Sequence, residues 1–83
     1  MKFVVIADVL GGGQTVSEHV AQTPTDAFRG WTEETGDFLG FQEELERIRE
    51  EELHPIDGLT NVWSASFAFG PENLHCTVHV VGR

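Results

Sequence analysis

The sequence predicts an α+β fold: a four-stranded, mostly antiparallel sheet with two helices on one face. Three observations lead to this fold class. Apolar or alternating segments open the chain, similar segments close it, and helix-like periodicity lies between them. The order strand, strand, helix, helix, strand, strand packs most simply as two hairpins in one sheet with both helices on the same side. At 83 residues the chain is one domain, spanning 1–83.

The first hairpin is predicted over residues 2–22. Residues 2–10 are almost continuously apolar and β-branched, which is typical of a central strand covered on both faces. Gly11–Gly13 then supply the conformational freedom that a tight turn needs. Residues 14–22 are more polar and favour a half-exposed strand, such as one at a sheet edge. Because the first strand is the most apolar, we expect it also to contact the second hairpin.

Thr23 begins the clearest local signal in the chain, a helix start. Its hydroxyl can cap a helix, Pro24 suits the first helical position, and the Asp26 carboxylate lies near the positive end of the helix dipole. We expect this helix to run over 24–35 and to stop at Gly36.

The inner face of this helix is predicted from spacings of three and four residues among Ala27, Phe28 and Trp31. Gly30 lowers helix propensity by roughly 1 kcal/mol relative to Ala, and a close approach to the sheet would explain its presence. Trp31 and Trp63 are predicted to be core residues, although large side chains of this kind also anchor partners.

A second helix is predicted to begin between Asp37 and Phe41 and to end before Pro55. Its apolar residues recur every three or four positions and form an inward stripe. That stripe consists of Phe38, Phe41, Leu45 and Ile48. The opposite side is rich in glutamate, including the last turn, where negative charge opposes the helix dipole.

Two strands, 59–69 and 74–80, are predicted to close the chain through a turn over 70–73 with Pro71 at its second position. Their alternation places apolar side chains against the helices. The face that the helices leave open is predicted to carry mainly polar side chains: Ser64, Ser66, His75, Thr77 and His79.

Charge is the strongest functional signal in the chain. Fourteen acidic and five basic residues give a net charge of −9, and the segment 33–52 carries −7 of it, with Arg47 and Arg49 as its only cations. Such a chain repels a phosphate backbone, so direct nucleic-acid binding is not expected, whereas a basic protein surface is a suitable partner. No segment approaches the ~20 apolar residues that span a bilayer. The predicted partner-binding residues are Glu43, Glu44, Glu46, Glu50 and Glu51.

Asp8, His19, His75 and His79 are the candidates for a ligand or enzyme site on the open face. A carboxylate near the end of an apolar strand needs polar partners if it is buried. His75 and His79 share a strand face but lie about 13 Å apart along it, too far to share one metal ion. Gly11–Gly13 lead into a strand without a following Lys, unlike a phosphate loop. We therefore predict no metal, cofactor or catalytic residue, and no enzyme.

Cys76 is the only cysteine, so no internal disulfide can form, which is typical of a reducing, cytoplasmic setting. The apolar N-terminal run is interrupted by Asp8 and followed by a poor cleavage context, so it is not predicted to be a signal peptide. His75, next to Cys76, would point to the other face of the strand, and the thiol is expected to be a small buried group rather than a nucleophile.

The opening hairpin followed by Thr23-Pro24-Thr25-Asp26-Ala27 resembles the hairpin and helix start of HicB-type antitoxins, over about the first third of the chain. The chain as a whole, including Gly12-Gly13-Gln14-Thr15-Val16-Ser17 and Asn61-Val62-Trp63-Ser64, is similar to small bacterial α+β proteins of no assigned activity. The first resemblance implies an interaction protein. Neither implies a catalytic residue.

Three functions follow as hypotheses. The leading one is a non-enzymatic interaction module, of the antitoxin, immunity or regulatory type, that binds a cationic partner through its acidic helix. The second is a structural homodimer joined through the second or last strand, with acidity serving solubility. The third is a small ligand-binding protein or enzyme that uses the open sheet face, which requires a concave pocket.

Overall fold

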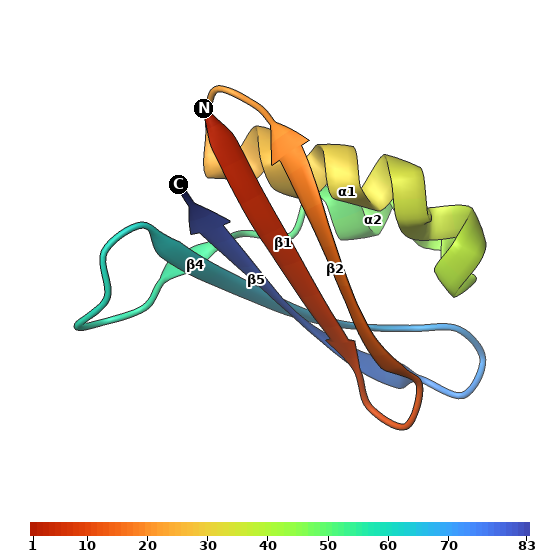
Figure 1. Ribbon diagram of the computed structural model, residues 1–83. Helices are drawn as coiled ribbons and strands as arrows, with labels where there is room; N and C mark the ends of the chain where they lie inside the picture. Colours follow the sequence, from red (N-terminus) through yellow and green to blue (C-terminus); the bar gives the residue numbers. More distant parts are fainter.

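The computed structural model describes all residues, Met1–Arg83, as an antiparallel sheet with two α-helices on one face (Figure 1). The elements in chain order are β1 (Lys2–Val9), β2 (Gly13–Val20), α1 (Pro24–Leu39), the 3-10 helix η1 (Gln42–Glu44), α2 (Leu45–Arg49), β3 (His54–Pro55), β4 (Val62–Phe69) and β5 (Leu74–Gly82). The predicted α+β class with two helices is confirmed. No helix is both long and apolar enough to cross a bilayer.

The sheet has five strands in the order β2-β1-β5-β4-β3, so the prediction of four strands was wrong. The additional strand is β3, in which His54 pairs with Ser64 and Pro55 with Trp63. Pro55 has no N–H to donate, which is tolerated because β3 lies at the sheet edge. A two-residue strand carries too little alternation to be visible in the sequence.

β1 is central, because it pairs with β2 on one side and with β5 on the other. This confirms the predicted contact with the second hairpin. The turn after β1 uses positive φ at Gly11 (79°) and Gly13 (100°), as the glycine run predicts. The prediction that this strand is covered on both faces was wrong: no helix covers its outer side, where Val4 and Ile6 are half-buried.

α1 begins as predicted, with the Thr23 hydroxyl accepting a hydrogen bond from the Asp26 N–H at 3.1 Å. Its predicted end was wrong, because the helix continues through Gly36 to a left-handed cap at Gly40 (φ 88°). Gly36 is buried against Phe41, and a Cβ at this position would lie 3.2 Å from Cε1 of that ring. A close contact, rather than a helix end, is therefore the reason for glycine at position 36.

The predicted long second helix is instead η1 followed by the five-residue α2. Phe38 belongs to α1 and is 79 % exposed, whereas Phe41 and Ile48 are buried and Leu45 is partly buried. The left-handed cap at Gly40 redirects the chain between Phe38 and Phe41. The apolar stripe is thus divided between two elements, which periodicity alone does not reveal.

An aromatic cluster fills the space between the helices and the sheet. Trp31 is fully buried, with ring centroids 5.8 Å from Phe28 and Phe41 and 6.3 Å from Phe67. Trp63 packs edge-on against Phe3, with 6.4 Å between the ring centroids. Both tryptophans therefore pack with the core, as predicted, and Trp31 is not available as a surface anchor.

Gly30 provides a first test, because alanine fits there without strain. A Cβ at Gly30 meets only His19 Nδ1, at 3.7 Å, an ordinary van der Waals distance. We therefore expect Gly30→Ala to raise the free energy of unfolding by about 0.5–1 kcal/mol through higher helix propensity. Urea unfolding followed by circular dichroism measures the change. Gly36→Ala is the matched control and should gain less or lose stability, and a Gly30→Ala variant that is less stable than wild type would contradict the expectation.

Candidate functional site

The carboxylates of the segment 33–52 lie on α1, η1, α2 and the residues that follow α2, on the helical side of the molecule (Figure 1). We call this set the acidic helical surface. Its members are Glu33, Glu34, Asp37, Glu43, Glu44, Glu46, Glu50, Glu51 and Glu52. Most of them are exposed, and Glu44 and Glu51 are half-buried.

Every arginine of the helical layer already has a carboxylate partner within the chain. The ion pairs are Arg29–Glu50 at 3.5 Å, Arg47–Glu44 at 2.8 Å and Arg49–Glu33 at 3.3 Å. The pair Arg49–Glu33 joins α2 to α1, and Arg29–Glu50 joins α1 to the residue that follows α2. Arg29 Nε also donates a hydrogen bond to the Arg49 carbonyl at 3.3 Å. Partly exposed pairs of this kind each contribute at most about 1 kcal/mol. They leave no free arginine to neutralise the remaining carboxylates.

Among the predicted partner-binding residues, Glu44 makes the most contacts within the chain. Its Oε1 accepts a hydrogen bond from the Gly70 N–H at 3.1 Å, and its Oε2 accepts one from Arg47 at 2.8 Å. Arg47 in turn donates to the Ala68 carbonyl at 2.7 Å. The carboxylate therefore ties η1 to the end of β4.

The five predicted partner-binding glutamates thus divide into two groups. Glu44 and Glu50 are engaged within the chain. Glu43 and Glu46 are exposed, Glu51 is half-buried, and none of the three forms an ion pair or a side-chain hydrogen bond. These three carboxylates can meet a partner without breaking an internal contact.

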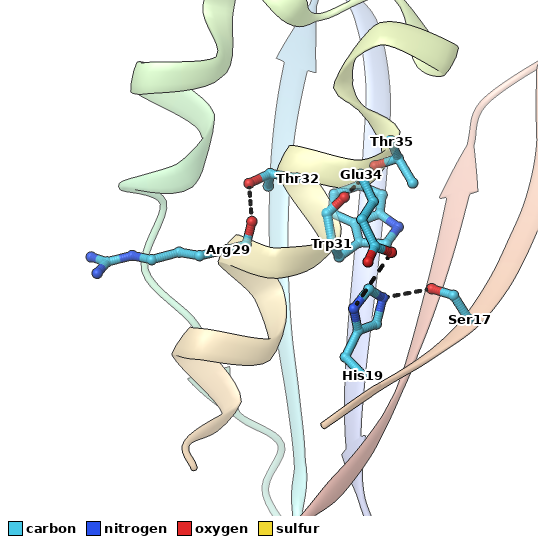
Figure 2. Close-up of polar contacts among 7 residues, drawn as sticks. All are labelled: Ser17, His19, Arg29, Trp31, Thr32, Glu34 and Thr35. Atoms are coloured by element: carbon cyan, nitrogen blue, oxygen red, sulfur yellow. Dashed lines mark hydrogen bonds and ion pairs between the residues drawn. The ribbon is translucent and has the colours of Figure 1, made fainter. Parts of the chain in front are cut away.

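His19 lies on the helix-facing side of β2 and is 8 % exposed, so its prediction as an open-face residue was wrong. In this edge strand the polar residues Ser17 and His19 face the helices, whereas Val16 and Val20 face outward. Figure 2 shows the resulting cluster between β2 and α1. The Ser17 hydroxyl and His19 Nε2 form a hydrogen bond of 2.9 Å, and His19 Nδ1 is 3.8 Å from a Glu34 carboxylate oxygen.

The order Ser17, His19, Glu34 is that of a nucleophile, a base and an orienting acid. The separation of 3.8 Å between His19 Nδ1 and the Glu34 carboxylate exceeds hydrogen-bond length, however, and His19 is buried. Acyl transfer requires a concave site with donors aimed at the developing oxyanion. What the observed contacts do is connect α1 to the sheet edge at β2.

The other open-face candidates do lie on that face but do not form one site. Asp8 is opposite Thr77 across the β1–β5 pair, and His79 is opposite Ile6. His75 is exposed near the far end of β5. No group of three or more His, Cys, Asp or Glu side chains is placed to hold a metal ion.

Cys76 is fully buried on the helix-facing side of β5, and its neighbour His75 is exposed. Removal from water and, secondarily, the negative charge of Asp8 raise the pKa of the Cys76 thiol to about 11. The thiol is therefore protonated at neutral pH, the form that is least reactive.

The open sheet face carries a feature that the sequence analysis missed, a set of outward aliphatic side chains. Cross-strand pairing aligns Val4, Val81 and Val62 in one row, beside Glu18, and Val16 with Ile6 in the next, beside His79 and Ser64. The sequence signal for these outward side chains is the continuous apolar run of β1. From that run we predicted that both faces of the strand are covered. Both helices lie on the other face (Figure 1).

Comparisons with models of known protein families, with curated protein sequences and with solved structures found no match to this chain. The geometry of the acidic helical surface and of the open sheet face is therefore the basis for assigning a function.

Proposed function

We propose that the protein is a non-enzymatic interaction protein whose acidic helical surface binds a cationic partner protein. One observation carries the proposal: the helical layer uses all of its arginines in internal ion pairs and still presents unpaired carboxylates, including Glu43 and Glu46. Residues 24–52 hold ten acidic residues, Asp26 included, against Arg29, Arg47 and Arg49, so this layer carries a net charge of −7.

The field of such a surface steers a basic partner toward the helices and repels nucleic acid. Exposed carboxylates act mainly on the association rate, and salt screens them over a distance of about 8–10 Å at physiological ionic strength. Binding is therefore expected to weaken as salt rises. An antitoxin, immunity or regulatory protein is the class of interaction protein that fits a small, strongly acidic chain and the resemblance of its first hairpin and helix start.

The test begins with capture on the immobilised protein at low salt and elution at high salt, followed by mass spectrometry of the eluate. The eluted basic protein is then titrated against the wild type and two double variants of equal net charge. Glu43→Lys/Glu46→Lys alters the acidic helical surface. Asp57→Lys/Glu72→Lys makes the same change of four charge units in exposed loop residues outside it.

We expect Glu43→Lys/Glu46→Lys to weaken binding about tenfold or more, since two attractive contacts become repulsive, and the loop variant to bind within about threefold of wild type. Calorimetric titration at two salt concentrations measures both effects. Equal weakening by the two variants would show that only net charge matters. Affinities unchanged in both, or unaffected by salt, would refute the proposal.

A further inference from the structure

The open sheet face is an extended surface that no element of the chain covers. Both helices lie on the opposite face (Figure 1). The outward side chains of β1 and β5 are half-buried or exposed. Two apolar side chains of the edge strand β2 are largely exposed on this face: Val16 is 63 % exposed and Val20 is 79 % exposed. Lone exposed valines are ordinary, whereas Val16 continues across the sheet into the half-buried Ile6, and Val4 into Val81 and Val62, so that these side chains form a patch.

The charge of this face differs sharply from that of the rest of the molecule. Its charged residues are Lys2, Asp8, Glu18 and Arg83, two of each sign, and Arg83 pairs with Glu18 at 3.6 Å. The face is therefore formally neutral with its histidines uncharged, although the chain carries −9. The helices that carry most of the acidic helical surface lie on the other side of the sheet (Figure 1).

We infer that the open sheet face binds a second copy of this chain, giving a face-to-face dimer with the acidic helical surfaces on its two outer sides. Charge favours this occupant. A cationic protein is drawn to the helices rather than to a neutral face, and an anionic partner is repelled by the chain as a whole. Two neutral faces can approach while their acidic sides stay at the greatest separation that the fold allows.

The size of the face is sufficient for this contact. Four strands spaced about 4.8 Å apart, each of eight residues rising about 3.3 Å, cover roughly 19 by 26 Å, or about 500 Å² in plan. Two copies then bury about 1,000 Å² or more, which is the lower bound for a specific interface. Two sheets stacked face to face lie about 10 Å apart, with the side chains of their inner faces interdigitated. A two-fold axis makes the contact self-complementary.

This inference goes beyond the proposed function and has the opposite dependence on salt. Two chains of −9 repel each other at long range, and salt screens that repulsion while leaving apolar burial intact. Dimerisation should therefore strengthen as salt rises, whereas binding of a cationic partner should weaken. The dimer also presents two acidic surfaces facing away from each other, so a partner would bind with two copies per dimer.

Sedimentation equilibrium of the full chain tests the inference by distinguishing a mass of 9.2 kDa from twice that value. Ile6→Lys and Val16→Lys place a cation in the apolar rows, and Gln22→Lys makes the same charge change in an exposed segment outside the sheet. Lysine lowers the net negative charge, so added repulsion between the acidic surfaces cannot explain a loss of association. Val16 is exposed, and its substitution leaves the core untouched.

We expect wild type and Gln22→Lys to dimerise, more tightly at high salt, and both open-face variants to raise the dissociation constant about a hundredfold or more. Circular dichroism confirms that each variant is folded. A wild-type chain that remains a monomer up to about 1 mM, the concentration at which even weak specific contacts are populated, would overturn the inference. A dimer that survives both lysine variants would also overturn it, because it would be joined through a strand edge such as β2.

Discussion

Replacing Trp31 with alanine should remove a large part of the stability of the domain. The side chain is fully buried and packs against Phe28, Phe41 and Phe67, so it joins both helical segments to the sheet. Truncating a buried tryptophan costs about 3–5 kcal/mol, which combines the lost transfer free energy with the cost of the cavity. A domain of this length has about 4–12 kcal/mol in total. Urea unfolding at neutral pH measures the loss.

The matched control is Trp31→Phe, which keeps most of the ring volume. The indole Nε1 of Trp31 is buried and has no hydrogen-bond partner, so phenylalanine removes an unsatisfied donor while it loses some packing. We expect Trp31→Phe to cost less than about 2 kcal/mol. If Trp31→Ala cost less than about 1 kcal/mol, or if the two variants were equally unstable, the aromatic cluster would not be the centre of the core.

Local chemistry could be predicted from the sequence where one residue type decides the conformation. Thr23 and Pro24 placed the start of α1 correctly, because a cap and a proline act within one helical turn. The alternation in β4 and β5 placed Ser64 and His79 on the open face, because strand geometry fixes the period at two.

The errors arise where tertiary contacts decide. Gly36 and Gly40 are both glycines near the expected helix end, and only the position of the Phe41 ring distinguishes the buried one from the cap. His19 is a polar residue that faces inward because Ser17 and Glu34 are within reach of its ring. The two-residue period of a strand places Ser17 beside His19, but neither the side of the sheet that this face meets nor the position of Glu34 can be inferred from the spacing along the chain.

The sequence predicted the acidic composition of the candidate site but not which of its carboxylates are engaged within the chain. The excess of carboxylates over 33–52 is visible in the sequence, but its division is not, because Glu44 meets Gly70 and Arg47 while Glu50 meets Arg29 only in the folded chain. The open face shows the same limit. A continuous apolar strand predicts burial of both faces, and only the packing shows that the chain supplies helices for one.

That incomplete coverage connects the two proposals. A chain of 83 residues has enough helix to cover one face of its sheet, and the helices that do so also carry the acidic residues. The uncovered face is left neutral and rich in aliphatic side chains. Assembly through that face and binding through the helices would therefore use separate surfaces, and substitutions in one should leave the other unaffected.

Raising the pH from 9 to 11 should destabilise the wild-type protein through Cys76. The thiol pKa is raised from 9.0 to about 11 in the fold, so within this window the unfolded chain loses the proton while the folded chain retains it. Unfolding is then favoured by about 1.4 kcal/mol per pH unit, up to about 2–3 kcal/mol in total, and this contribution is fully present below pH 9. The chain has no tyrosine and only one lysine, Lys2, so few other side chains titrate in this range.

Cys76→Ala is the control, because it removes the titrating group from both the folded and the unfolded chain. Its free energy of unfolding at pH 8 is lower than that of wild type by the cost of the cavity, but it should fall less steeply between pH 9 and 11. Urea unfolding at four pH values, with reductant present, gives both curves. Parallel curves would mean that the thiol titrates alike in both states, which is incompatible with a side chain held out of water beside the negative charge of Asp8. Converging curves would identify Cys76 as a buried core residue whose ionisation opposes folding.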